Sequence, residues 1–195
     1  DTRHCAAMVE VEAALARAQG ACGVIPPEST EAISTALSGF VADNAALGAG
    51  SEAAGVPVPA LVAQLREAVG GVAARFIHWG ATSQDIIDTA RVLVLRETIA
   101  DFETAMERVI TALAAMARNH AETVMLARTR MQQAAPTTFG LKVAGWRAPL
   151  VRNRERLAQL KSRLLVAQFG GAAGTLAPLG DKASDVRVAF AKELQ

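Results

Sequence analysis

The chain has 195 residues, of which 51% are hydrophobic, so it is long enough to bury a core and too apolar to be disordered. Its 20 basic and 19 acidic residues give a formal net charge of +1, which offers no reason to expect nucleic acid or a membrane surface as partner. Aromatic residues make up only 4%, and an apolar content carried mainly by alanine, leucine and valine favours helices packed on helices.

The two cysteines predict no disulfide. Cys5 and Cys22 would stand about 25 Å apart in one helix, which is too far for a bridge. A break at Gly20 or Gly23 would bring them closer, but two free thiols in a reducing compartment is the simpler interpretation. No apolar run approaches the roughly 20 residues of a membrane span, and no basic-then-apolar leader is visible. We therefore expect a cytoplasmic protein.

Apolar residues at helical spacing predict helices at about 3–19, after Pro26 and Pro27, and at about 60–69. Residues 48–59 are rich in glycine and proline and are predicted to form a loop, and residues 76–85 a second one. We expect residues 1–83 to form an N-terminal helical domain whose start is missing, since the chain does not begin with methionine.

The second part of the chain predicts two long helices, at about 84–120 and 138–166. In the first of them apolar residues recur at alternating spacings of four and three, which is typical of a helix packed nearly parallel to others. Such a helix would be about 55 Å long, so we expect an elongated bundle shared within an oligomer. The expected fold class is all-α, with residues 84–195 forming part of a central bundle whose C-terminal remainder is missing.

The loop of residues 76–85 is the first candidate site. Thr82 or Ser83 at the start of the long helix would leave backbone N–H groups facing outward, and with the helix dipole these form an anion site. Gly80 allows close approach of the backbone, and His78 adds an imidazole. The alternative is that Thr82 or Ser83 only caps the helix, that Asp85 favours its first turn, and that His78 is a loop histidine whose hydrogen bonds are satisfied.

A second cluster of polar residues precedes the other long helix. Arg128, Arg130 and Gln132 would suit a di- or tricarboxylate, and Thr138 and Lys142 follow them. The alternative is an ordinary connection between helices with Thr137 or Thr138 as the cap. The glycine-rich turn of residues 170–175 has no preceding strand, so a packing turn is expected there rather than a phosphate-binding loop.

The order of these segments resembles the fumarase/aspartase superfamily. The run His78-Trp79-Gly80-Ala81-Thr82-Ser83-Gln84-Asp85 resembles its first shared region, Pro136-Thr137-Thr138-Phe139-Gly140 the end of its second, and Gly170 to Thr175 its later Gly-Thr turn. Most lyases of the superfamily carry Thr-His-Gly-Gln where this chain has Thr129-Arg130-Met131-Gln132. Arg130 in place of that histidine argues against adenylosuccinate lyase, and it fits the bacterial 3-carboxy-cis,cis-muconate cycloisomerases, which also lack the histidine.

The resemblance implies an intramolecular lyase that cyclises 3-carboxy-cis,cis-muconate to 4-carboxymuconolactone in protocatechuate breakdown. On this interpretation Thr82 and Ser83 hold one substrate carboxylate, and Arg130 and Gln132 hold another or stabilise the developing enediolate. His78 is either the titrating group among the matched positions or a further ligand of a substrate carboxylate. Thr138 and Lys142 complete the substrate-binding candidates. An adenylosuccinate lyase-like or other C–N or C–O lyase, and a non-catalytic helical scaffold, are the alternatives.

The resemblance also implies which partners the chain has. They are a small tricarboxylate substrate and three further copies of the chain in a homotetramer that shares its sites between subunits, with no nucleic acid and no membrane. No cofactor and no metal are expected. The superfamily's flexible loop with a proton-transferring serine is expected beyond Gln195, so this fragment alone is expected to be inactive.

Overall fold

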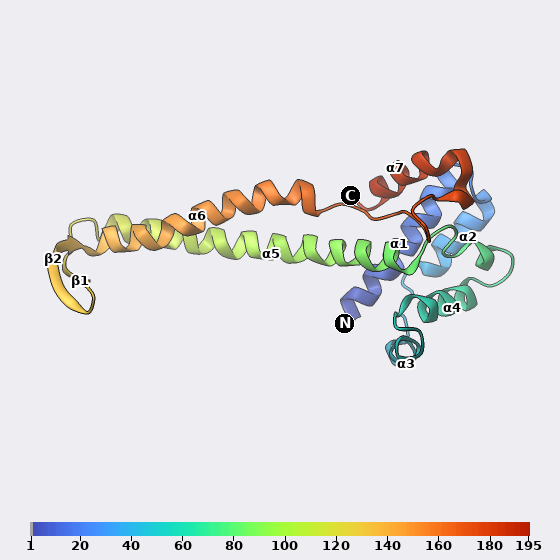
Figure 1. Ribbon diagram of the computed structural model, residues 1–195, viewed down its shortest axis with the longest axis horizontal. Helices are drawn as coiled ribbons and strands as arrows, with labels where there is room; N and C mark the ends of the chain where they lie inside the picture. The colour runs from blue at the N-terminus through green and yellow to red at the C-terminus, as the bar shows by residue number, and fades with distance from the viewer. Residues whose placement is uncertain (1) are drawn as a thin grey trace. The chain divides into compact units, whose positions relative to one another are not determined.

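The computed structural model describes residues 2–195, and Asp1 lies outside the described residues. Their elements, of which Figure 1 labels the α-helices and the strands, follow the order α1 (Thr2–Ala21), α2 (Pro27–Leu37), α3 (Asn44–Ala54), α4 (Val58–Val69), η1 (Ala73–Phe76), α5 (Ser83–Asn119), β1 (Val124–Thr129), β2 (Gln132–Thr138), α6 (Phe139–Leu164), η2 (Ala177–Lys182) and α7 (Ala183–Glu193). Contacts divide the chain into two compact units, one formed by the residues up to Leu95 with Leu165–Gln195 and the other by Arg96–Leu164.

The first unit is built around α1. This helix packs against both α2 and α7, and its residues Met8 and Leu15 are almost completely buried. Ile33 of α2, Leu61 of α4 and Phe190 of α7 belong to the same hydrophobic core. Because the core draws on both ends of the chain, residues 165–195 fold as part of the N-terminal unit.

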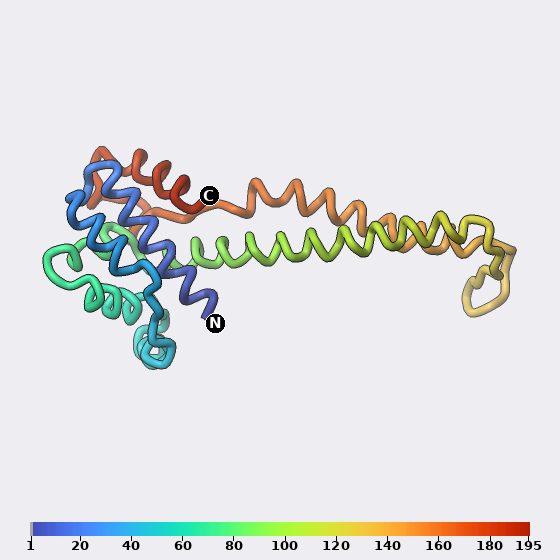
Figure 2. The backbone as a smooth tube through the Cα atoms, turned by 180° about the vertical axis from the view of Figure 1, so that it is seen from behind, coloured from blue at the N-terminus to red at the C-terminus, as the bar shows by residue number. Residues whose placement is uncertain are grey.

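The second unit is a pair of helices joined by a hairpin, as Figure 2 shows. Glu103 of α5 lies 2.9 Å from Lys161 of α6, and Glu107 lies 2.8 Å from Arg154. Residues later in α5 thus meet residues earlier in α6, so the two helices run antiparallel. Near their joined ends a Cβ on Gly140 would lie 2.5 Å from the carbonyl O of Ala117, so only glycine fits there.

The all-α class is confirmed, and the predicted helices correspond to α1, α2, α4, α5 and α6 within a few residues at each end. Both cysteines are free, as expected. No helix among residues 2–195 is both long enough and apolar enough to span a membrane. The contact boundary falls after Leu95 rather than at residue 83, and the domain division of the whole protein stays a prediction.

The predicted loop at residues 48–59 is wrong over its first half, which lies in helix α3. Asp43 caps this helix, since its Oδ1 accepts hydrogen bonds from the N–H groups of Ala45 and Ala46 at 2.9 and 3.2 Å. A Cβ on Gly50 would lie 2.4 Å from the Cβ of Ala60. The low helix propensity of glycine favours a loop here. In the structure, the missing side chain of Gly50 allows α3 to approach α4.

One short segment forms a strand hairpin that the all-α expectation did not include. Strands β1 and β2 pair antiparallel from Val124↔Thr138 to Thr129↔Gln132, with an irregularity between Leu126 and Arg128. The two-residue turn consists of Arg130 and Met131, whose φ values are +45° and +65°. Such turns normally contain asparagine or glycine, so this hairpin carries no recognisable turn signature in the sequence.

Candidate active site

The loop between η1 and α5 is held through two backbone carbonyls. Gln19 of α1 donates from Nε2 to the carbonyl O of Trp79 over 2.7 Å. Arg66 of α4 donates from a guanidinium nitrogen to the carbonyl O of Ile77 over 3.2 Å. The Ile77 side chain is itself buried in the core. The residue between these two carbonyls, His78, is therefore fixed on both sides.

His78 has an unusual backbone and a buried partner. Its φ is +64°, in the left-handed region that residues other than glycine rarely adopt. Its Nδ1 lies 2.6 Å from Oε1 of Glu12 on α1, and the Glu12 side chain is only 1% exposed. No described residue forms a hydrogen bond with Nε2. Conformations of this kind persist where the surroundings hold them, and they cluster at functional sites.

The Asp85 carboxylate connects the start of α5 to the glycine-rich turn. Its Oδ2 accepts hydrogen bonds from the N–H groups of Thr82 at 3.0 Å and Gly171 at 2.9 Å, and its Oδ1 accepts one from Gly170 at 2.9 Å. Thr82 thus occupies the position before the helix, and Asp85 returns a bond to its N–H, as in a capping box. The expected packing turn at residues 170–175 is confirmed, because Asp85 occupies its first two N–H donors.

Thr82 and Ser83 keep part of the predicted anion site free. Both are partly buried, and no described residue forms a hydrogen bond with either hydroxyl. The N–H groups of Ser83 and Gln84 lie in the first turn of α5, where a helix supplies no acceptor. Since Asp85 takes the Thr82 N–H, an incoming carboxylate would meet two hydroxyls and the N–H groups of the next two residues.

Two close approaches hold the loop against the returning chain. A Cβ on Gly171 would lie 2.7 Å from the carbonyl O of Gly80. Further along α5, the Thr89 hydroxyl donates to the carbonyl O of Gln168 and accepts from its N–H, both over 3.0 Å. The candidate site is therefore a compact assembly of loop, helix start and glycine-rich turn.

The other predicted residues lie in the second unit. Arg130 is the first turn residue of the hairpin, Gln132 begins β2, and both are exposed. No described residue forms a hydrogen bond or ion pair with either side chain. The next turn residue, Met131, is 95% exposed. The hairpin thus presents a cation and an amide for a partner or ligand.

Thr138 and Lys142 have structural contacts of their own. The Thr138 Oγ1 accepts a hydrogen bond from the N–H of Leu141 over 3.2 Å, so it caps α6 as the alternative interpretation had it. The Lys142 Nζ lies 5.7 Å from the centre of the Trp146 ring. Their role in substrate binding stays a prediction.

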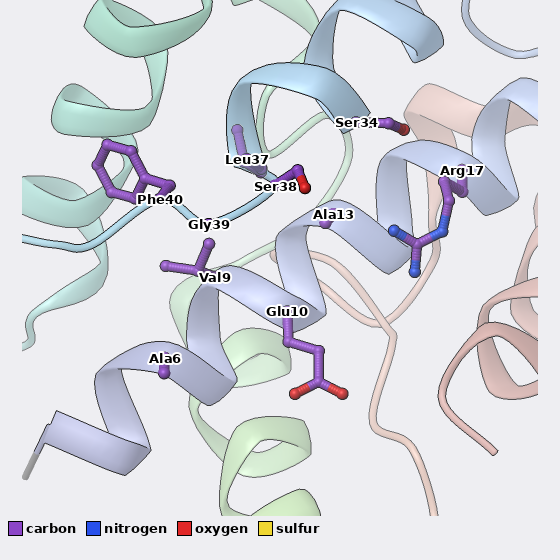
Figure 3. A pocket seen from close by; sticks show the side chains of 10 residues that line it. All are labelled: Ala6, Val9, Glu10, Ala13, Arg17, Ser34, Leu37, Ser38, Gly39 and Phe40. Atoms are coloured by element: carbon purple, nitrogen blue, oxygen red, sulfur yellow. The ribbon is translucent and has the colours of Figure 1, made fainter.

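A separate cavity of about 380 Å³ lies beside α1 and α2, and Figure 3 shows its lining. None of the predicted site residues contributes to it. Its one guanidinium, that of Arg17, already pairs with Glu193 of α7. The cavity therefore offers a carboxylate no free cation, and it is not the candidate site.

Sequence analysis missed Glu12 and Gln19, the two polar residues of α1 that reach the His78 loop. Both are buried and lie in line with Met8 and Leu15 at spacings of four and three. A polar residue at such a position in an apolar stripe is the signal that could have found them. Thr89 was missed for a different reason, because its partner Gln168 is far away along the chain.

Comparisons with known proteins show which family the chain belongs to. A family model described as lyase matches residues 1–195. The 3-carboxy-cis,cis-muconate cycloisomerase of Bradyrhizobium diazoefficiens is 49% identical over 191 residues, which are 96% of this chain and 42% of that protein. Crystal structures of a fumarate lyase from Mesorhizobium sp. BNC1 and of the 3-carboxy-cis,cis-muconate lactonizing enzyme from Pseudomonas putida superpose with TM-scores of 0.96 and 0.94, at 43% and 41% identity. Each alignment covers 100% of this chain and, respectively, 46% and 45% of the other.

The chain belongs to the lyase family, and its fold is that of the fumarase/aspartase superfamily, as the resemblance implied. It is similar over nearly its whole length to 3-carboxy-cis,cis-muconate cycloisomerases. It spans less than half the length of the curated relatives it matches.

Proposed function

We propose that the protein to which this chain belongs cyclises 3-carboxy-cis,cis-muconate to 4-carboxymuconolactone. The observation that carries this proposal is the high identity to cycloisomerases across both units, together with an arginine, Arg130, at the turn of the hairpin. Its guanidinium stays protonated and cannot exchange a proton at neutral pH. It is therefore suited to holding a carboxylate and not to proton transfer.

In the proposed reaction a carboxylate oxygen of the substrate attacks an alkene carbon of the same molecule and forms the new C–O bond. The π electrons move into a neighbouring carboxylate and give an enediolate, which then takes a proton on carbon. The enzyme has to fold the substrate so that the oxygen and the alkene meet, and it has to stabilise the enediolate charge. No external nucleophile is needed.

The described residues supply fixed donors for these tasks. Thr82 and Ser83, with the N–H groups at the start of α5, would hold one carboxylate. Arg130 and Gln132 would hold a second or stabilise the enediolate. His78 would act as a proton-exchanging group or as a further ligand of the substrate, and Thr138 and Lys142 would bind its periphery. The donor of the carbon-bound proton is expected in the part of the protein beyond this chain.

A homotetramer is the proposed assembly. In the second unit, Ile99, Phe102 and Met106 of α5 and Leu157 and Leu160 of α6 line an apolar groove. Phe102 is 62% exposed within the single chain. Long helices with an exposed apolar stripe are typical of bundles built from several subunits. Other copies of the protein would cover this stripe and would complete each site with residues from neighbouring subunits.

The test uses the full-length protein. Turnover would be followed as loss of the ultraviolet absorbance of the substrate diene, with adenylosuccinate as the comparison substrate and light scattering to measure the assembly. We expect a tetramer that turns over 3-carboxymuconate and does not turn over adenylosuccinate. A folded tetramer that turns over adenylosuccinate would identify a different lyase, and one that acts on neither and binds neither would be a scaffold.

A further inference from the structure

The buried carboxylate of Glu12 is costly for the fold. Its side chain lies on the core-facing stripe of α1 between Met8 and Leu15, and its Oε2 has no hydrogen-bond partner among the described residues. A charge buried with one oxygen unpaired destabilises a protein, and replacing a whole buried ion pair by apolar side chains is often neutral or better. Among residues 2–195, the one hydrogen-bonding contact of this carboxylate is that of Oε1 with Nδ1 of His78, at 2.6 Å.

Helix α1 contributes a second side chain to the same loop. Gln19 follows Glu12 by two turns on the same face, and it bonds the carbonyl O of Trp79, next to His78. Together with Arg66 on the carbonyl O of Ile77, this contact fixes the backbone at the strained φ of His78. The hydrogen bonds to the two neighbouring carbonyls fix the position of the His78 backbone, and the contact with Glu12 fixes the rotation of the imidazole ring.

The contact also selects the protonation pattern of the ring. A carboxylate can only accept, so the proton of a neutral imidazole is held on Nδ1 and the lone pair remains on Nε2. Nε2, which has no hydrogen-bond partner among residues 2–195, is then left as an acceptor. Fixing one ring nitrogen in order to define the other is how carboxylates orient functional histidines.

We infer that Glu12 is a positioning residue for His78, holding its imidazole in the Nδ1-protonated form with Nε2 as a free acceptor. The catalytic consequence rests on the proposed function, but the orientation of the ring does not. Glu12 touches no substrate in this arrangement and acts only through His78.

The central experiment replaces Glu12 by leucine in the full-length protein. Glu12→Leu continues the apolar stripe of α1 but leaves Nδ1 of His78 without its acceptor, so the two effects on the thermal midpoint oppose each other and we expect little change in it, while kcat falls about 10- to 100-fold and KM changes little. The matched control is Glu10→Gln, on the same helix but exposed and paired with Arg3, which should leave kcat unchanged. A double variant Glu12→Leu/His78→Gln should be no slower than His78→Gln.

The second readout does not need activity. Solid-state ¹⁵N spectra of histidine-labelled protein, with the His78 signal assigned by its loss in His78→Gln, report which ring nitrogen carries the proton. We expect the Nδ1-protonated form in the parent and its loss in Glu12→Leu. If the parent fails to turn over carboxymuconate, the proposed function fails while this spectrum still tests the inference.

Three outcomes in folded variants would overturn the inference. The first is an unchanged His78 signal in Glu12→Leu, and the second is full activity of Glu12→Leu. The third is a fall in kcat of the double variant that equals the product of the falls in the two single variants. Glu12→Gln, which keeps the volume and the polarity, serves as the second variant. Loss of folding in both variants would make Glu12 a structural residue and would equally refute a positioning role.

Discussion

The N–H of Gly171 lies 2.9 Å from Oδ2 of Asp85, a carboxylate 86 residues earlier in the chain. The same carboxylate receives the N–H groups of Gly170 and Thr82. Three donors converge on one buried side chain, so the start of α5 and the glycine-rich turn form a single structural unit. This contact determines where the donors of the candidate site stand.

Asp85→Asn is expected to lower the thermal midpoint of the full-length protein, with a loss of about 1.5–3 kcal/mol in the free energy of unfolding. The amide has one acceptor oxygen, and its NH₂ group would face N–H donors. Thermal unfolding and hydrogen exchange at Gly170 and Gly171 would measure the effect. Asp88→Asn, at a partly exposed position one turn later, is the control, and equal midpoints for the two variants would contradict the assignment.

Gly171→Ala is expected to destabilise more than Gly174→Ala. Both glycines have φ near +70°, so both alanine variants carry the backbone penalty of about 1–2 kcal/mol. Only at Gly171 would the new Cβ meet an atom, the carbonyl O of Gly80 at 2.7 Å, whereas nothing lies within 4 Å at Gly174. Chemical denaturation of both variants measures the difference. Equal losses would show that the close approach is not maintained in solution.

Ser83→Ala is expected to reduce kcat/KM for 3-carboxymuconate by about 10-fold or more, the effect of losing one hydrogen bond to a charged group. The loss should appear mainly in KM if the hydroxyl holds a carboxylate that does not react. Thr104→Ala is the control, since the Thr104 hydroxyl bonds only the carbonyl O of Ala100 in its own helix. Steady-state kinetics decide, and unchanged kcat/KM would remove Ser83 from the site.

Arg130→Lys tests whether the hairpin arginine binds a carboxylate in a bidentate manner, through two parallel hydrogen bonds. Lysine keeps the charge but lacks the planar pair of donors, so we expect a fall in kcat/KM of about 10-fold or more. Arg128→Lys, in the adjoining strand β1, is the matched comparison. Equal effects of the two substitutions would indicate a general electrostatic role for the hairpin.

His4→Gln is expected to stabilise the protein in acid and to have little effect at pH 8. Burial, and secondly the nearby charge of Arg91, lowers the pKa of His4 below its usual 6.5. Since the unfolded chain then binds the proton more readily, stability is lost as pH falls below 6.5, and glutamine removes that loss. Denaturation midpoints at pH 5.5 and pH 8 would show it, and a pH-independent difference would contradict it.

Sequence reasoning found the long helices and the His78 loop because each carries a local signal. The long helices show regular apolar spacing, and the loop concentrates capping and polar residues around Thr82 and Ser83. It missed Glu12 because a single charge within a helix usually faces water, and only the packing of α1 shows that this one does not. The hairpin at Arg130 and the helix around Gly50 went unrecognised because tertiary pairing overrides weak local preferences there.

The two hydrogen bonds between Thr89 and Gln168 join the second turn of α5 to the chain just after the end of α6. Residues 90–167 therefore form a closed loop whose two ends are held together by this one contact. The entropy of closing such a loop rises only logarithmically with length, by about 0.6 kcal/mol per doubling. Whole helical turns can therefore be added to or removed from α5 and α6 in matched pairs over evolution, while the geometry around His78 stays the same.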